Sequence, residues 1–185
     1  MKIDKDMQLG HTVIDDFLPI AEFAFMSTSI NSEMFPWNYT PRKITDDGDE
    51  SLHNHQFVHS IIGYNGGMPS LVSDHANVLG PILNLIKPTA VLRAKINLTT
   101  SSSTPHCFSP HIDEHYGVPT TTAIFYMNTN NGYTSLLPVN TKIYSKANTM
   151  LLIRGDKQHL GTTSSDTKTR IVVNINYIGG EINAL

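Results

Sequence analysis

The chain lacks several features on which other small proteins depend. It has one cysteine, Cys107, in 185 residues, which excludes an internal disulfide and is typical of a reducing compartment. No apolar run approaches the roughly 20 residues that a membrane span requires, and no apolar core of a signal peptide follows the charged first residues. We therefore expect a cytoplasmic protein with no membrane partner.

The chain also lacks a strong excess of either positive or negative charge. The 13 lysines and arginines and the 16 acidic residues give a net charge of −3, and the basic residues are scattered along the chain. Proteins that bind nucleic acid usually carry a basic patch, so no nucleic-acid partner is expected. With 39% hydrophobic residues, a chain of this length buries about 70% of its unfolded surface, and we assign residues 1–185 to one domain.

Residues 1–88 are expected to form an N-terminal helical support region. A short strand is predicted over residues 12–17, and Pro19 suits the first turn of a helix that runs to about Ser29. Apolar and small side chains recur along this helix at helical spacing. The predicted buried stripe consists of Ile20, Phe23, Ala24 and Ser27.

A second helix is predicted to begin at Pro69 and to run to about Ile86, because apolar residues fall at helical spacing there. Pro81 is expected to kink or split it. Residues 31–56 are rich in turn-forming residues. The acidic run at 46–50 lacks the spacing of a calcium-binding loop and is expected to be a solvated loop.

Two features of this first part have alternative interpretations. Trp37, the single tryptophan, is either a core anchor or one wall of a substrate cleft. His53, His55 and His59 share a face if residues 52–62 form a strand. That group is either a second metal site, a polar cleft lining or plain surface.

The pattern changes to a period of two after Pro88, and no helical segment interrupts it. Many short strands in succession favour an antiparallel sandwich or barrel over a parallel sheet. We expect residues 89–178 to form this β core. The predicted strands cover residues 90–99, 120–128, 133–145, 148–153 and 169–178.

A candidate metal site lies within the β core. His111 and Asp113 are two residues apart, so both side chains leave the same face of an extended segment. His159 precedes a later strand that could bring it beside this pair, although His115 continues the His-x-Asp-x-His alternation as a competitor. Two imidazoles and one carboxylate are the ligands of non-haem Fe(II) oxygenases, which leave the opposite positions of the metal open.

Arg170 begins the last predicted strand, in which polar and apolar residues alternate. A buried arginine is costly without a partner, whereas one that holds a carboxylate by two hydrogen bonds is stable. Lys168 lies two positions earlier and is expected to belong to the preceding turn. We therefore expect Arg170 to bind a carboxylate.

The chain resembles the Fe(II)/2-oxoglutarate-dependent dioxygenases, specifically the prolyl-4-hydroxylase-like branch. The order His-x-Asp, distal His and Arg carries this resemblance, together with residues 122–128, which are similar to a strand ending in Tyr-Leu-Asn, and residues 131–134, which resemble a Gly-Gly-x-Thr turn. Residues 13–19 look like the entry into the first helix. The resemblance implies a double-stranded β-helix, a jelly-roll or cupin-like barrel, flanked by N-terminal helices.

The resemblance also implies a site. Fe(II) would be held by His111, Asp113 and His159, with 2-oxoglutarate and O2 as co-substrates and with succinate and CO2 released. The far carboxylate of 2-oxoglutarate would pair with Arg170 and meet the hydroxyl of Tyr126. The protein positions these groups and excludes water.

The sequence departs from the prolyl-hydroxylase pattern at three inward positions of the predicted co-substrate pocket. Asn174 and Asn176 replace a small hydroxyl residue and a tryptophan, and Asn97 replaces a tyrosine, so the pocket is expected to differ in detail. Arg93 and Lys95 either orient an anionic group nearby or are exposed charges on a strand edge.

Three classes of function remain open at this point. The first, which the resemblance favours, hydroxylates a protein or peptide side chain. The second oxidises a small molecule or a nucleobase, and the third is a non-catalytic metal-binding jelly roll. The pair His106-Cys107 also permits a thiol hydrolase, but adjacent residues of an extended chain point to opposite faces, so Cys107 is expected to be neither nucleophile nor disulfide.

Overall fold

The computed structural model describes residues 2–6, 10–43, 51–65, 67–113 and 116–182. The predicted solvated loop at 46–50 and the competing ligand His115 lie outside the described residues. Within them the fold is mainly β, with two short α-helices, α1 (Ile20–Ile30) and α2 (Gly80–Ile86), and one 3-10 helix, η1 (Ala76–Leu79).

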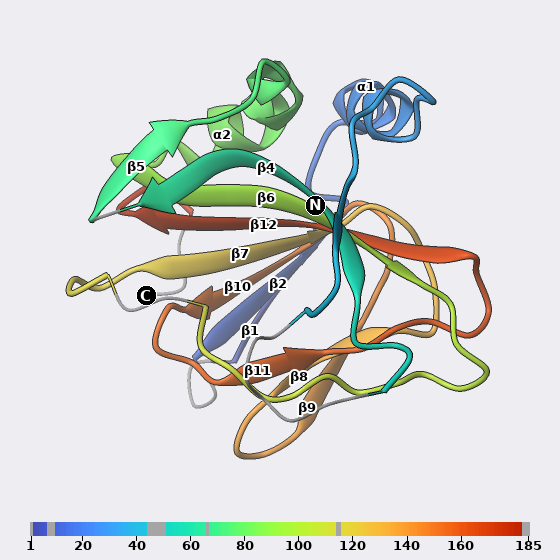
Figure 1. Cartoon of the computed structure of the whole chain (residues 1–185). Helices are drawn as coiled ribbons and strands as arrows, with labels where there is room; N and C mark the ends of the chain where they lie inside the picture. The colour runs from blue at the N-terminus through green and yellow to red at the C-terminus, as the bar shows by residue number, and fades with distance from the viewer. Residues whose placement is uncertain (1, 7–9, 44–50, 66, 114–115, 183–185) are drawn as a thin grey trace.

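The strands form one large and one small antiparallel sheet (Figure 1). The large sheet has the order β1-β2-β10-β7-β12-β6-β4-β3, with β5 paired to β4, and the small sheet has the order β11-β8-β9. The strands are β1 (Lys2–Asp6), β2 (His11–Asp15), β3 (Asn38–Thr40), β4 (Gln56–Asn65), β5 (Met68–Leu71), β6 (Ala90–Thr100), β7 (Thr121–Tyr126), β8 (Tyr133–Leu136), β9 (Thr141–Tyr144), β10 (Thr149–Arg154), β11 (His159–Gly161) and β12 (Thr169–Ile178).

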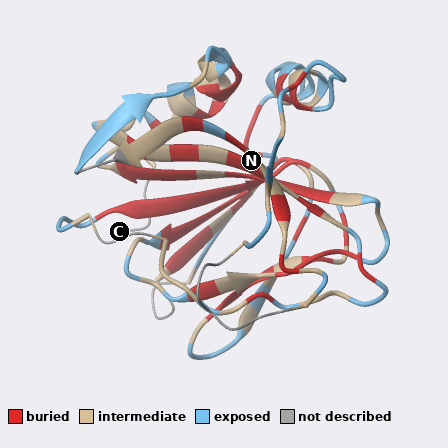
Figure 2. Cartoon of the chain, viewed as in Figure 1, coloured by how far each residue is buried: buried red, intermediate tan, exposed pale blue. Residues whose placement is uncertain are grey.

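The large sheet is covered on both faces. In Figure 1 the helices lie above it and the small sheet lies below it. The main hydrophobic core joins α1, η1 and α2 to one face, where Phe23 of α1 contacts Phe125 of β7 at 6.1 Å between ring centroids. A second cluster on the opposite face includes Ile124 of β7 and Leu136 of β8. The central strands are therefore buried along their length (Figure 2).

The core strands occur where the alternation predicts them, with two differences, of which the first is the additional short strand β11. The single stretch expected over residues 133–145 is a hairpin of β8 and β9, in which Leu136 pairs with Thr141. Asn140 in its turn has a φ of 59°, a left-handed conformation that asparagine tolerates better than most residues.

The expected helical support region at residues 1–88 is corrected in part. This part of the chain contains α1 and α2, but it also contributes strands β1 to β5 to the large sheet. The helix expected from Pro69 is wrong in its first half, because Met68–Leu71 pairs with β4 as a strand. Of the two expectations for Pro81, the structure agrees with a split rather than a kink: η1 ends at Leu79, and Pro81 lies in the first turn of α2, where its missing N–H costs nothing.

The first helix has the expected bounds but a different buried face. Met26 and Ile30 are the buried residues of α1, whereas Ile20 is 79% exposed and Ala24 is also exposed. The helix contacts the sheet through the side that carries Phe23, Met26 and Ile30. The expected stripe was therefore wrong by part of a turn, since periodicity alone does not fix how a helix is rotated against a sheet.

Candidate functional site

The three predicted metal ligands meet on one side of the large sheet. The backbones of His111 and His159 exchange two hydrogen bonds of 2.9 Å, which place the start of β11 beside the His-x-Asp segment. The ligand atoms of His111, Asp113 and His159 all lie within 4.8 Å of one another. Among the described residues this is the only group of histidine, cysteine and acidic side chains that could hold a metal ion.

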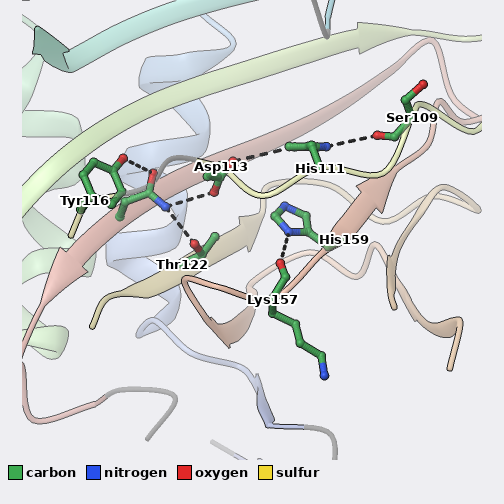
Figure 3. A network of polar contacts seen from close by, with 8 residues as sticks. Ser109, His111, Asp113, Tyr116, Thr122, Lys157 and His159 are labelled. Carbon is green, nitrogen blue, oxygen red and sulfur yellow. Dashed lines mark hydrogen bonds and ion pairs between the residues drawn. The ribbon is translucent and has the colours of Figure 1, made fainter. Parts of the chain in front are cut away.

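The orientation of both imidazoles is fixed by backbone carbonyls (Figure 3). The Nδ1 atom of His111 lies 3.2 Å from the carbonyl oxygen of Ser109, and that of His159 lies 3.1 Å from the carbonyl oxygen of Lys157. Each Nδ1–H donates to its carbonyl, so the lone pair remains on Nε2, which is the arrangement of a metal-binding histidine.

Asp113 is oriented by a polar network from the neighbouring strands (Figure 3). The side-chain amide of Asn176 donates to its Oδ2 at 3.0 Å and to the hydroxyl of Thr122 at 2.8 Å. The Tyr116 hydroxyl donates to the Asn176 carbonyl oxygen at 3.2 Å. Asn176 is thus a residue that sequence reasoning placed inside the pocket but did not connect to the metal ligands.

The protonation states also suit a metal ion. Burial, with a smaller effect of His159, lowers the pKa of His111 to about 4. Burial opposes ionisation of Asp113, but His159, Lys95 and the Asn176 amide outweigh it and lower the pKa of Asp113 to about 2. Near neutral pH the site therefore offers a neutral imidazole and an ionised carboxylate, the forms in which these side chains bind metal.

A cavity of about 320 Å³ opens beside the three ligands. It runs along β6 and β12, which pair in antiparallel register. Besides the ligands, it is lined by Lys43, Gln56, Arg93, Lys95, Asn97, Ile112, Ile124, Thr134, Gly161, Arg170, Val172 and Asn174. It therefore joins the ligands to the predicted anion-binding residue.

Arg170 lies in this cavity and is 3% exposed. Its Nε donates to the hydroxyl of Ser145 at 2.7 Å and its Nη2 to that of Thr134 at 3.3 Å. Gly132 allows this packing, since an added Cβ would lie 2.6 Å from the Cδ of Arg170. No carboxylate in the described part of the chain pairs with the guanidinium, whereas Lys168 is exposed as expected for a turn residue.

Tyr126 supports Arg170 from behind the cavity wall. Its hydroxyl donates to Thr134 at 2.9 Å, and the guanidinium carbon of Arg170 lies 5.6 Å from the centre of its ring. Burial raises the pKa of Tyr126, so the phenol stays protonated. The structure thus brings Tyr126 beside Arg170 but leaves Thr134 between its hydroxyl and the cavity.

Asn97 and Asn174 both line the cavity, as expected. Asn97 of β6 pairs with Val172, and Asn174 of β12 pairs with Lys95. Their buried Oδ1 atoms have no hydrogen-bond partner. Because buried polar atoms are rarely left unpaired, these two oxygens are candidates to bind a polar group that enters the cavity.

Lys43 is a cavity residue that sequence reasoning missed. It lies 3.6 Å from the centre of the Phe108 ring, and burial together with the nearby Arg170 lowers its pKa well below the usual value. A Cβ placed on Gly161 would lie 3.2 Å from the Lys43 amine and 3.7 Å from Nη1 of Arg170. Lys43 and Arg170 are therefore neighbours in the cavity.

The other candidate residues lie outside the cavity. His59 contacts the carbonyl of Pro36 and the hydroxyl of Ser73, both at 2.7 Å, and His55 contacts Leu52 and Thr100. Of the alternatives for the histidine group, a second metal site has no support among the described residues, because none of the three histidines belongs to a group of three or more possible metal ligands.

The contacts of Trp37 and Cys107 give neither residue a role in the cavity. Trp37 packs against the main core and contacts the ring of Phe35 at 5.1 Å, as a core anchor does. Cys107 is exposed, and its sulfur lies 3.3 Å from the Tyr133 hydroxyl. Across the described residues, no helix is long and apolar enough to span a membrane.

Comparison with known proteins identifies the fold. Neither a protein-family profile nor a curated protein sequence matches the chain. Among solved structures, it is similar to an oxidoreductase of the 2OG-Fe(II) oxygenase family from Burkholderia pseudomallei, with a TM-score of 0.68, 12% identity, and coverage of 95% of this chain and 90% of that one. The chain therefore has the fold of the 2-oxoglutarate/Fe(II) oxygenases.

Two further structures show the range of proteins with this fold. A prolyl hydroxylase from Trichoplax adhaerens, in complex with a hypoxia-inducible-factor peptide, gives a TM-score of 0.62 at 14% identity and covers 93% and 84% of the two chains. HygX from Streptomyces hygroscopicus, with nickel and 2-oxoglutarate bound, gives 0.54 at 12% identity and covers 95% and 85%. The resemblance seen in the sequence is thus confirmed at the level of the fold.

Proposed function

We propose that this protein is an Fe(II)- and 2-oxoglutarate-dependent dioxygenase. The observation that carries the proposal is a single cavity with the metal-binding group His111, Asp113 and His159 at one end and the buried, carboxylate-free Arg170 at the other. Two imidazoles and one carboxylate suit iron with open positions better than a closed zinc site. Iron held by these three residues would supply the chemistry that oxidises a substrate carbon, with succinate and CO2 as co-products.

The residues of this chain divide the binding of 2-oxoglutarate between them. Arg170 offers a planar guanidinium, already positioned by Ser145 and Thr134, to the far carboxylate. Lys43 adds a second positive charge at that end. Asn97 and Asn174 are proposed to contact the co-substrate between its two ends, through side chains that line the cavity.

The chain also controls water and orientation at the metal end. The carbonyls of Ser109 and Lys157 hold the two imidazoles in one tautomer, and Asn176 keeps the Asp113 carboxylate in place. The apolar side chains of Ile124 and Val172 line the cavity, and they restrict the water that could compete with substrate. Such positioning and exclusion of water is the protein's main contribution to this chemistry.

The two antiparallel sheets support a finer assignment of the fold. We assign residues 89–178 to a double-stranded β-helix, or jelly roll, within one domain over residues 1–185. The small sheet faces the large one across the cavity, and β11 carries His159 beside Asp113 while β12 carries Arg170. A closed barrel of this kind places ligands at its mouth.

The prolyl-4-hydroxylase-like branch, which the sequence resembles, favours a protein or peptide side chain as the substrate. A prolyl hydroxylase with bound peptide has this fold, which supports a peptide substrate, whereas the small-molecule and nucleobase classes remain the alternative. Composition and charge support an intracellular enzyme without nucleic-acid or membrane partners.

The proposal is tested by the turnover of 2-oxoglutarate to succinate by the purified protein. Turnover should require added Fe(II) and O2, and a substrate screen should find a product that has gained one oxygen atom. His75→Ala, at an exposed histidine outside the cavity, is the matched control for substitutions of the ligands. Absence of 2-oxoglutarate binding by the metal-loaded protein would refute the proposal.

A further inference from the structure

Arg93 and Lys95 are two further cations in the cavity, besides Arg170 and Lys43. Both line the cavity and both project from the same face of β6, whose opposite face carries the buried residues Leu92, Ala94 and Ile96. Arg93 lies opposite Asn176 in the register of β6 and β12, and Lys95 lies opposite Asn174. This pair is therefore at the metal end.

The position of β6 excludes one explanation for these charges. Lysines and arginines on sheet edges often serve to keep edges apart from other chains. β6 is not an edge strand, because it pairs with β12 on one side and with β4 on the other. The two cations also point into the cavity, so repulsion of other chains does not account for them.

The described residues give these cations no anionic partner other than Asp113, whose charge acts on Lys95. Among the described residues, neither Arg93 nor Lys95 forms an ion pair, and the nearest carboxylate, Asp113, is a metal ligand held by Asn176. Burial and the neighbouring Arg93 lower the pKa of Lys95 to about 8. Holding two cations together in a buried site is unfavourable unless an anion binds between them.

The charge of the cavity exceeds what the co-substrate can neutralise. Among the described residues, four cationic side chains and one carboxylate line it, a formal excess of three positive charges. A divalent metal ion raises this excess by two, and 2-oxoglutarate, with one carboxylate at each end, lowers it by two. A formal excess of three therefore remains in the cavity as a whole, although the whole chain carries a net charge of −3.

We propose that the primary substrate carries an anionic group, a carboxylate or a phosphate, which binds between Arg93 and Lys95 near the carbon that is oxidised. This inference rests on the proposed function and narrows its substrate class. A neutral side chain such as proline would leave both cations unpaired beside the metal. An acidic residue of a peptide and a small free acid present the same group.

The test uses the protein loaded with Mn(II) and saturated with 2-oxoglutarate, so that binding is measured without turnover. Calorimetry compares acidic probes with neutral partners of similar shape: glutamate with glutamine, and O-phosphoserine with serine. Each pair is measured as the free amino acid and within an end-capped tripeptide. The four comparisons distinguish carboxylate from phosphate and a small acid from a peptide.

At least one acidic probe should bind the wild type tenfold or more tightly than its neutral partner. Arg93→Gln and Lys95→Met should each remove most of this preference, while the dissociation constant of 2-oxoglutarate, measured separately, should change by less than threefold. Lys142→Met, at an exposed lysine of β9 outside the cavity, should retain the preference.

Three outcomes would overturn the inference and leave the proposed function intact. They are equal binding of acidic and neutral probes by the wild type, a preference that survives both substitutions, and a loss of 2-oxoglutarate affinity in Lys95→Met as large as the loss of the preference. The last result would show that Lys95 binds the co-substrate instead. Failure of the wild type to bind 2-oxoglutarate at all would instead refute the proposed function.

Discussion

The two ends of the cavity lie along the same pair of strands, β6 and β12, but they offer different groups to a ligand. The metal end joins two imidazoles to the ionised carboxylate of Asp113, which suits a cation. The far end joins Arg170 to Lys43, which suits an anion. A ligand that coordinates metal at one end and carries a carboxylate at the other satisfies both, and 2-oxoglutarate is such a ligand.

The two ends also differ in how far the protein itself positions and neutralises their charged groups. Carbonyl oxygens and the Asn176 amide hold the metal ligands in place. The partners of Arg170 are the hydroxyls of Ser145 and Thr134, which orient the guanidinium but do not neutralise its charge. Substitutions at the two ends should therefore have separable effects, one on metal binding and the other on co-substrate binding.

The largest effect is expected at the metal end. Asp113→Ala removes the one anionic ligand, and metal-dependent turnover of 2-oxoglutarate should fall below detection. Mn(II) binding, measured by calorimetry, should be lost with it, whereas His75→Ala should bind metal like the wild type. Tight metal binding by both Asp113→Ala and His159→Ala would show that the ligand set is wrong.

Substitutions at the far end should weaken the binding of 2-oxoglutarate and leave metal binding almost unchanged. Removing a buried charged partner typically costs several kcal/mol, so Arg170→Ala should weaken 2-oxoglutarate binding by about two to three orders of magnitude at 1.4 kcal/mol per tenfold. Mn(II) affinity should change by less than threefold. Arg170→Lys should restore only part of the loss, because an ammonium group cannot form the paired hydrogen bonds of a guanidinium.

Lys168→Ala provides the control for Arg170, because it removes a nearby exposed cation on the same segment. It should bind 2-oxoglutarate like the wild type. If Lys168→Ala loses 2-oxoglutarate and Arg170→Ala does not, the assignment of the far end is wrong.

Substitution of Asn176 should have an intermediate effect, and this effect should be confined to metal binding. Residues that orient metal ligands typically change metal affinity by about 10- to 100-fold when they are substituted. Asn176→Ala should therefore weaken Mn(II) binding within that range, with 2-oxoglutarate affinity at saturating metal nearly unchanged. Asn84→Ala, on the exposed side of α2, should change neither quantity, and a selective loss of 2-oxoglutarate in Asn176→Ala would contradict the assigned role.

The same comparison explains how much of the site the sequence could predict. The metal end was predictable because two ligands are two residues apart on one extended segment, and Arg170 follows from the alternation of a single strand. The role of Asn176 was not, since it depends on β12 and the His-x-Asp segment coming together. Local patterns specify which face a side chain is on; contacts across strands need the tertiary fold.

The fold shows the same limit. The alternation after Pro88 predicted strands β6, β7, β10 and β12. The burial of β6 largely alternates as predicted, whereas β7, β10 and most of β12 are buried on both faces. Met68–Leu71 was misassigned, because its pairing with β4 prevails over an apolar spacing that also fits a helix. Lys43 could not be found from sequence, because it lies in a turn-rich stretch with no signal that it enters the cavity.

The smallest effect on 2-oxoglutarate binding is expected from substitution of Lys43, the neighbour of Arg170. Its amine lies against the Phe108 ring, an arrangement that stabilises a cation without supplying a counter-charge. A carboxylate at Arg170 would provide that charge, so Lys43→Met should weaken 2-oxoglutarate binding, but by only about threefold to tenfold, or about 1 kcal/mol. Lys142→Met should show no change.

The effect of Lys43 should also depend on pH. Burial and Arg170 hold its pKa well below the usual value for lysine, so rising pH removes its charge earlier than that of an exposed lysine. Because only the charged form attracts the co-substrate, the difference in 2-oxoglutarate affinity between wild type and Lys43→Met should narrow as pH rises. The Arg170→Ala deficit should persist over the same range, since a guanidinium stays protonated. A Lys43→Met deficit that grows with pH would show that its uncharged amine, rather than its charge, contributes to binding.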